Sequence, residues 1–239
     1  MCMDYTYLVF VLPAVILSMI ASYMVKQRFS RYNQVISRKG ITGAQAAELL
    51  LRANGIADVG IARTGGSLTD NYNPGTKILS LSDSTYASTS IAAIGVAAHE
   101  TGHAIQHHVG YSPLALRSTL VPVANIGSRF GPTMAILGII FGASAQSGGM
   151  LALAQLVTDI GLVLFAGAVL FYIITLPVEF DASRRALKIL GETGTLDAEE
   201  LSGVRKVLWA AAMTYVASAL TAIGNLVRLI VLSGRRNRR

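Results

Sequence analysis

The chain has 239 residues, of which 52% are hydrophobic and only 14% are charged. A soluble domain of this length carries roughly a quarter charged residues, so the composition indicates a membrane protein with a few spans and one modest polar region. The net charge of +7 does not indicate nucleic-acid binding. The positive residues cluster beside apolar runs, where they can meet anionic lipid head groups; they include Lys26, Arg28, Arg31, Arg38, Lys39, Arg184, Arg185 and Lys188.

One cysteine, Cys2, is present. It excludes an intramolecular disulfide and a metal site built from thiolates. Any metal bound by this chain must therefore take histidine and carboxylate ligands.

Residues 1–25 are predicted to form an N-terminal transmembrane anchor. Tyr5 to Val25 is an uncharged run of about the length that spans a bilayer. No Lys or Arg precedes this run, whereas Lys26 and Arg28 follow it. The pattern predicts an uncleaved anchor with its N-terminus outside and residue 26 onward in the cytoplasm.

Residues 26–118 form the long polar stretch of the chain and are predicted to fold as a small cytoplasmic α/β region. Thr42 and Gln45 stand at capping-box spacing, at the start of a helix that ends at Gly55. The segments "DVGIART" and "TKILSLSDS" predict short strands separated by the turn "TDNYNPGT". The second of these strands could be a substrate-binding edge strand or a plain core strand. A second helix is predicted from about Ser88 to Gly110.

Residues 119–178 are predicted to form a transmembrane hairpin. Its first span, from Leu120 to Ala143, contains Pro122 and Pro132 and is expected to kink. Its second span runs from Leu151 to Val178. Arg129 in the first span and Asp159 in the second are expected to pair, because unpaired charges inside a membrane are costly.

Residues 179–206 are predicted to return to the cytoplasm. Residues 207–239 then form a C-terminal helix and a basic tail, and the apolar stretch from Val207 to Leu232 either spans the membrane or lies along its surface. The predicted fold is a mainly α membrane protein. It has about four transmembrane helices and a small α/β zincin-like region that carries an HExxH helix.

The segment "AAHETGHAIQ" carries His99 and His103 four residues apart, with Glu100 between them. On a helix, positions i and i+4 lie on one face, so both imidazoles can bind one zinc ion. Glu100 lies beside them and can act as the general base toward a zinc-activated water. The motif therefore predicts a catalytic Zn²⁺ site that still requires a third ligand.

The third ligand must come from outside the motif helix. The metzincin pattern requires glycine and histidine where this chain has Gln106 and Val109. His107 lies a further turn along the helix, about 6 Å of rise from His103, so His107 and its neighbour His108 are expected to be polar residues of the helix end.

Two acids on the second half of the predicted hairpin remain as candidates for this ligand. Asp159 and Glu179 lie 20 residues apart on one predicted helix, or roughly 30 Å, so only one of them can reach the zinc. The hairpin returns Glu179 to the surface that the motif helix left, whereas Asp159 falls deep in the bilayer. The predicted zinc ligands are therefore His99, His103 and Glu179.

Two long stretches, from "LTDNYNPGTKILSLSDSTYASTSIAAIGVAAHETGHAIQHHVGY" onward and "TLPVEFDASRRAL", resemble the YugP-like neutral zinc metallopeptidases of bacterial membranes. The resemblance covers nearly the whole chain. It implies a membrane-bound zinc peptidase in which His99, His103 and a downstream acid bind the metal.

The chain is similar, more distantly, to the HtpX and CAAX prenyl protease group. That group carries a downstream E-x-x-A-D motif, in which the Glu is a ligand and the Asp supports the site. "EFDAS" matches this motif at Glu179 and Ala182 but has Ser183 in place of the aspartate. A hydroxyl can still hydrogen-bond a ligand, although it orients a histidine less firmly than a carboxylate does. Asp181 is expected to point to the other face of the helix.

These features predict an integral-membrane zinc-dependent endopeptidase of the bacterial cell membrane, with several spans and a cytoplasmic active site. Its expected partners are membrane lipid and protein or peptide substrates at the membrane surface. The alternatives are a noncatalytic membrane scaffold or assembly factor with a structural zinc, and a small transporter that uses Arg129 and Asp159. Glu100 discriminates between them, because a structural zinc site needs no general base. The oligomeric state stays open.

Overall fold

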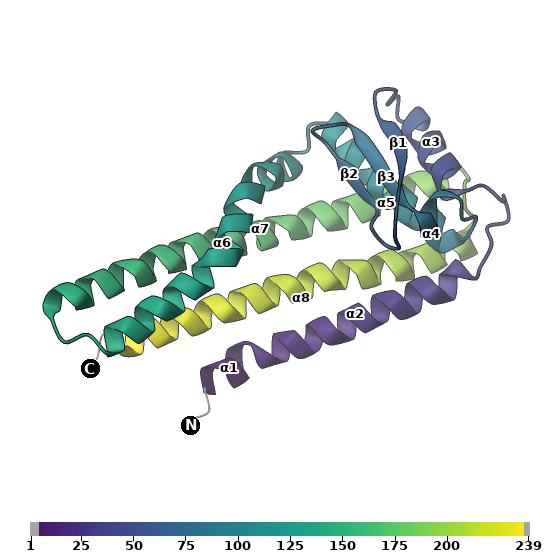
Figure 1. Cartoon of the computed structure of the whole chain (residues 1–239). Helices are drawn as coiled ribbons and strands as arrows, with labels where there is room; N and C mark the ends of the chain where they lie inside the picture. The colour runs from purple at the N-terminus through teal and green to yellow at the C-terminus, as the bar shows by residue number, and fades with distance from the viewer. Residues whose placement is uncertain (1–4, 237–239) are drawn as a thin grey trace. The chain divides into compact units, whose positions relative to one another are not determined.

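The computed structural model describes residues 5–236, which are drawn in colour in Figure 1. The chain divides into two compact units. Unit 1 comprises residues up to Ile20, Leu116–Thr175 and the chain from Tyr215 onward. Unit 2 comprises Ala21–Ala115 and Leu176–Thr214. The first four residues of the predicted anchor and the last three of the predicted basic tail lie outside the described residues.

Within the described residues, unit 1 consists of helices joined by short turns. It contains α1 (Tyr5–Phe10), the first residues of α2 (Leu12–Asn33) and parts of three long helices, which are α6 (Ser112–Ala143), α7 (Gly148–Glu192) and α8 (Ala198–Arg236). Small residues let α6 and α7 approach closely, because a Cβ on Gly127 would stand 2.1 Å from the carbonyl oxygen of Leu164. Packing of small residues against a neighbouring backbone is typical of helices in membranes.

Three helices, α6, α7 and α8, are long and apolar enough to cross a membrane. The predicted N-terminal span from Tyr5 to Val25 is not one continuous helix, since α1 and α2 are separated by a turn at Val11. Within residues 5–236, length and composition therefore support three spans, and the N-terminal span remains a prediction.

The pairing predicted between Arg129 and Asp159 is wrong. Asp159 accepts a hydrogen bond from Gln155 Nε2 at 2.9 Å, and the Arg129 guanidinium lies 5.6 Å from the centre of the Phe130 ring. Each of these contacts is with a neighbour on the same helix, and no ion pair joins Arg129 to Asp159 within residues 5–236. Pro122 and Pro132 both lie inside α6, which continues as one assigned helix through them.

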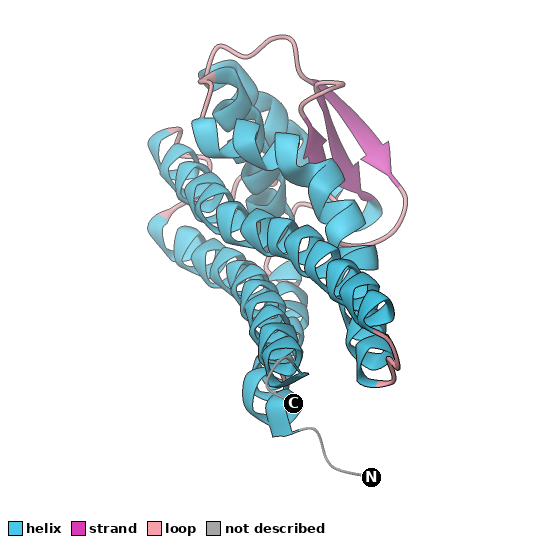
Figure 2. Cartoon of the chain, turned by 90° about the vertical axis from the view of Figure 1, so that its left-hand side faces the viewer, coloured by secondary structure: helices cyan, strands magenta, loops and turns pink. Residues whose placement is uncertain are grey.

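Unit 2 contains a three-stranded sheet with the order β1-β3-β2, drawn in magenta in Figure 2. β1 (Gly60–Thr64) pairs in parallel with β3 (Ile78–Ser82), and β2 (Asn71–Asn73) pairs with β3 in the antiparallel direction. The segment predicted as a turn thus contributes the third strand. β3 is the central strand, so the edge-strand interpretation of "TKILSLSDS" is wrong and the core-strand one is confirmed.

Helices of unit 2 pack against one face of this sheet and against one another. α3 (Gly43–Ala53) begins with the predicted capping box, in which the Thr42 side chain accepts from the Gln45 backbone and the Gln45 side chain accepts from the Thr42 backbone. Leu79 and Leu81 of β3 are fully buried with Ala47 of α3 and Ala97 of α5 (Ile91–His108). The short helix α4 (Asp83–Tyr86) links β3 to the segment before α5.

A second apolar cluster fixes α5 against the ends of α7 and α8 that belong to unit 2. It joins Ile94 and Ala98 of α5 to Ala186 and Leu190 of α7 and to Val204 of α8, all with at most 1% of their surface exposed. Burial of aliphatic side chains on this scale is the main stabilising term of a small domain. The cluster therefore holds the HExxH helix beside the α7 residues that follow the predicted hairpin.

Candidate metal centre

The two motif histidines project from one face of α5, as the spacing predicts. α5 starts at an N-cap, Ser90, whose side chain accepts from the backbone of Ala93 at 3.1 Å and donates to Asn33 Oδ1 at 2.7 Å. The rings of His99 and His103 lie 4.8 Å apart between centroids, at an interplanar angle of 84°. The edge-to-face arrangement brings the Nε2 atoms of both rings toward one point.

Glu179 of α7 supplies a carboxylate at that point. Its Oε2 atom lies 3.2 Å from His99 Nε2 and 3.7 Å from His103 Nε2. One ligand atom from each of the three residues lies within 4.8 Å of the others. Ligands at 2.0–2.2 Å from a tetrahedral zinc ion are about 3.3 Å apart, so the two separations between Glu179 and the imidazoles are close to those around a single ion. Only 2% of Glu179 is exposed, and a carboxylate this deeply buried requires a compensating cation or proton.

The hydrogen bonds of the His103 ring leave its Nε2 atom as an acceptor. The Gln106 Nε2 atom donates to the Val178 carbonyl at 2.8 Å and to Asp181 Oδ2 at 2.9 Å. This double donation fixes the orientation of the amide, so Gln106 Oε1 faces His103 Nδ1 at 3.0 Å as an acceptor. His103 must then carry a proton on Nδ1, and its Nε2 lone pair is available for a metal.

Asp181 is linked to His103 by hydrogen bonds although it lies on the other face of α7, as expected. The chain of hydrogen bonds runs from His103 through Gln106 to Asp181, and Arg184 and Arg185 both form ion pairs with the Asp181 carboxylate. Asp181 does occupy a different helix face from Glu179. Gln106 of α5 bridges the distance, so the contact depends on a second helix that spacing along α7 does not reveal.

Ser183 contacts the other ligand. Its hydroxyl lies 3.1 Å from His99 Nδ1, at the position where the HtpX and CAAX prenyl protease pattern has an aspartate. The hydroxyl oxygen can accept the Nδ1 proton and so leave the His99 Nε2 lone pair facing Glu179. Both histidines are therefore oriented by oxygen acceptors behind the ring, as in established zinc sites.

Negative charge around the pair acts on the His103 imidazole. Burial is the largest influence and alone would lower the pKa of His103, but the nearby carboxylates of Glu179 and Glu100 outweigh it. The pKa of His103 is therefore raised above its ordinary value. Because a metal binds only the neutral imidazole, a metal ion at Nε2 would compete with a proton there.

Glu100 is partly exposed and lies next to His99 on α5. Within the described residues its carboxylate makes no hydrogen bond or ion pair. Its charge raises the pKa of His103, so the carboxylate lies close enough to act on that ring.

The remaining candidates lie apart from the cluster. His107 Nδ1 is hydrogen-bonded to the Tyr72 hydroxyl of β2 at 2.8 Å, and His108 is exposed at the end of α5. Asp159 belongs to unit 1, where its carboxylate accepts a hydrogen bond from Gln155. The exclusion of His107, His108 and Asp159 as ligands agrees with this geometry.

Sequence reasoning missed the roles of Gln106 and Gly102. A Cβ on Gly102 would stand 2.6 Å from the Ala182 carbonyl oxygen, so glycine at this position lets α5 approach the α7 backbone. Gln106 follows His103 by three residues, a spacing at which helix side chains meet. The spacing could have predicted the contact between Gln106 and His103. No sequence pattern indicates the close approach at Gly102.

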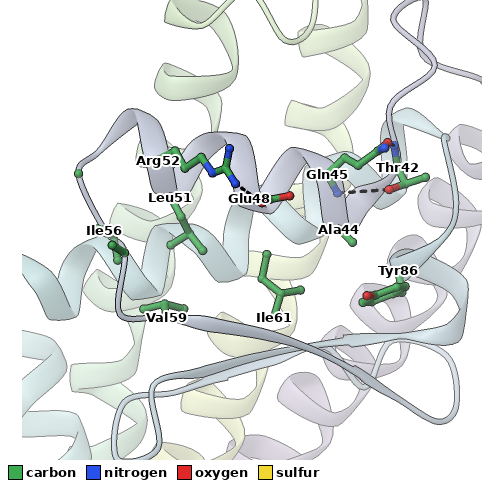
Figure 3. Close-up of a pocket in the computed structure, with 12 residues that line it drawn as sticks. Thr42, Ala44, Gln45, Glu48, Leu51, Arg52, Ile56, Val59, Ile61 and Tyr86 are labelled. Carbon is green, nitrogen blue, oxygen red and sulfur yellow. Dashed lines mark hydrogen bonds and ion pairs between the residues drawn. The ribbon is translucent and has the colours of Figure 1, made fainter.

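A wide groove of about 800 Å³ lies elsewhere in unit 2, between α3 and β1 (Figure 3). Its charged lining residues, Glu48 and Arg52, form an ion pair with each other at 2.6 Å. None of the clustered histidine and glutamate ligands lines it, so the groove gives no argument for the chemistry of the metal centre.

Comparison with known proteins identifies the family of the chain. Residues 7–234 match the model of a family described as "Putative neutral zinc metallopeptidase". The chain is 42% identical over 221 residues to "Putative membrane protease YugP" of Bacillus subtilis (strain 168), which covers 92% of this chain and 93% of that protein. No solved structure matches the chain. The chain therefore belongs to the neutral zinc metallopeptidase family that the resemblance predicted.

Proposed function

We propose that this chain is an integral-membrane zinc endopeptidase in which His99, His103 and Glu179 bind the metal and Glu100 is the general base. The observation that carries the proposal is the convergence of three acceptor atoms, from α5 and α7, within 4.8 Å. The family match and the membrane protease relative support the same function.

The residues present fit zinc. Two imidazoles and one carboxylate are a known ligand set for catalytic zinc, which keeps a further position for water or substrate. When bound, zinc lowers the pKa of water and polarises the carbonyl of the scissile peptide bond. The Nδ1 contacts of His99 with Ser183 and of His103 with Gln106 hold both rings in the required orientation.

Glu100 performs the proton transfers in this proposal. Its carboxylate takes a proton from the attacking water and then delivers that proton to the leaving amine nitrogen. A positioned acid–base group contributes roughly 10²–10⁴-fold to rate. The carboxylate suits this role because neighbouring side chains of the described structure leave it without an ion pair.

The site is proposed to lie on the cytoplasmic face, close to the membrane. Glu179 directly follows the apolar run that ends at Val178, and the flanking segments are rich in Lys and Arg. The substrates expected for such a site are membrane proteins, or segments released beside the membrane. Lipid is the other expected partner, and nucleic acid is not expected.

The test compares the wild-type chain with Glu100→Gln and His99→Ala. Purified Glu100→Gln should retain about one zinc per chain, whereas His99→Ala should lose it. Peptide termini in membranes from cells that produce wild-type enzyme should include products absent with either variant. Wild-type products in the presence of Glu100→Gln would contradict the catalytic proposal and favour the scaffold with a structural zinc.

A further inference from the structure

A second groove of about 410 Å³ lies between α7 and α8 of unit 2. Its lining is formed by one stripe of each helix: Phe180, Ser183, Arg184, Leu187 and Lys188 on α7, and Arg205, Leu208, Trp209 and Ala212 on α8. The spacings of three, four and seven residues place each set on a single helix face. The volume lies within the roughly 300–1,000 Å³ typical of ligand sites.

The lining is cationic and includes no acidic side chain. Arg205 forms no ion pair in the part of the chain that the structure describes. Arg184 shares Asp181 with Arg185, and Lys188 lies 3.8 Å from Glu192. Both groove cations on α7 remain mostly exposed, with side-chain exposures of 78% and 69%. The groove therefore offers at least one uncompensated positive charge and favours an anionic ligand.

Charge and apolar surface are ordered along the groove. Lys188, Arg184 and Arg205 lie toward one end, whereas Phe180, Trp209 and Ala212 lie toward the other. The distance from Lys188 to Phe180 along α7 is roughly 12 Å. The apolar end of the groove is the end nearer to the long apolar run of each helix. On α7 that run precedes Val178, and on α8 it follows Val207.

This order matches an amphiphile with an anionic head and a hydrocarbon chain. We propose that the groove between α7 and α8 is a binding site for one anionic phospholipid. The phosphate lies among Arg184, Lys188 and Arg205, and an acyl chain lies along Phe180 and Trp209. Basic groups beside apolar helices are suited to anionic head groups, and an amphipathic aromatic residue such as tryptophan is favoured at the membrane interface.

The site goes beyond the proposed peptidase function and does not depend on it. Ser183 lines the groove and also contacts His99, so a bound lipid would lie near the ring of a proposed zinc ligand. The inactive variant Glu100→Gln should bind lipid as the wild type does, which separates a failure of this proposal from a failure of the catalytic one.

Trp209 provides a direct measurement, because it is the single tryptophan of the chain and 53% of its surface is exposed. The full-length protein is reconstituted into liposomes of phosphatidylcholine that contain brominated phosphatidylglycerol or, separately, brominated phosphatidylcholine. Bromine quenches tryptophan fluorescence on contact. Quenching of Trp209 should be stronger with the anionic lipid at the same mole fraction, and high salt should weaken the difference.

Arg205→Gln should reduce the preference for phosphatidylglycerol roughly fivefold, the value expected for one cation near a membrane surface. Arg205→Lys should retain most of it. Lys206→Gln is the matched control, because Lys206 is the adjacent residue on α8 and does not line the groove. Zinc content and circular dichroism establish that each variant is folded.

Equal quenching by the two lipids in the wild type would overturn the proposal, and so would an unchanged preference in Arg205→Gln. Inorganic phosphate in the buffer should not remove the quenching by phosphatidylglycerol. Full displacement by phosphate would identify a free-phosphate site instead. Displacement by a soluble Asp- and Glu-rich peptide would assign the groove to an acidic peptide rather than to lipid.

Discussion

Gly102 of the HExxH helix lies against the main chain of Ala182, where a Cβ would stand 2.6 Å from the carbonyl oxygen. Ala182 follows Glu179 by three residues on α7. The closeness of the two helices at this point is what allows a carboxylate side chain to reach the two imidazoles. The glycine inside the motif thus controls the distance between ligands on different helices.

Gly102→Ala should therefore weaken the metal centre although alanine is the better helix former. The new methyl group must displace the α7 backbone, and overpacking of this kind costs about 1–3 kcal/mol. We expect reduced zinc content and a lower midpoint of thermal unfolding. Gly149→Ala, at a position of α7 with no atom within 4 Å of the added Cβ, is the control and should retain both. Full zinc occupancy in Gly102→Ala would show that the helices can separate without loss of the site.

The hydrogen-bond chain from His103 through Gln106 to Asp181 gives a second prediction. Gln106→Leu removes the acceptor of the His103 Nδ1 proton, and loss of such a contact typically costs 10- to 100-fold in metal affinity. Asp181→Asn keeps the shape of the side chain and should cost less. Competition with a chelator of known affinity measures both effects.

The control for these variants is Glu192→Gln, which alters another acid of α7 that pairs only weakly with Lys188. Its zinc affinity should equal that of the wild type. The supporting role of Gln106 is wrong if folded Gln106→Leu binds zinc as tightly as this control.

Much of the site could be predicted because its strongest constraint is local. The i, i+4 spacing of His99 and His103 fixes their common face on any helix, and connectivity alone returns Glu179 to the same surface. Contacts that require a particular helix–helix register could not be predicted. Asp181 reaches the site only through Gln106, and the β2 strand was hidden because its three residues lie in a segment rich in turn formers.

In the fold, too, features set by nearby residues could be predicted, whereas features set by contacts between distant segments could not. The Thr42 capping box and the start of α5 at Ser90 follow from side chains within three residues. The central place of β3 in the sheet depends on pairing with β1, a parallel partner nearly twenty residues away. The Arg129–Asp159 prediction was wrong: Asp159 accepts a hydrogen bond from Gln155 and Arg129 lies near Phe130, each a neighbour on the same helix.

Substitution of Glu179 and substitution of Asp159 should have opposite effects on the zinc content. Glu179→Ala should lose the metal as fully as His99→Ala and His103→Ala do, because each variant leaves only two ligands. Asp159→Ala should retain about one zinc per chain. Elemental analysis of the purified proteins, with circular dichroism to establish folding, distinguishes them. Stoichiometric zinc in a folded Glu179→Ala protein would remove Glu179 from the ligand set.

The last prediction concerns the side of the membrane on which the metal centre lies. The segment 179–206 contains five cations, Arg184, Arg185, Lys188, Arg205 and Lys206, whereas the turn 144–147 between α6 and α7 contains none. Positive charge in short loops favours the cytoplasm, so both ligand-bearing segments are expected inside. The basic C-terminal tail opposes this orientation if α8 crosses fully, because it would then lie outside.

Single cysteines in a Cys2→Ser background test the orientation. Gly65→Cys places a thiol in the loop after β1, where a side chain meets no atom within 4 Å, and Gln146→Cys places one in the exposed turn between α6 and α7. In intact cells an impermeant maleimide should label residue 146 and should label residue 65 only after the membrane is opened. Because the positive-inside rule acts on the short loops beside each span, the reverse pattern would mean that the whole orientation is inverted. The metal centre would then face the outside, and the expected substrates would be extracytoplasmic.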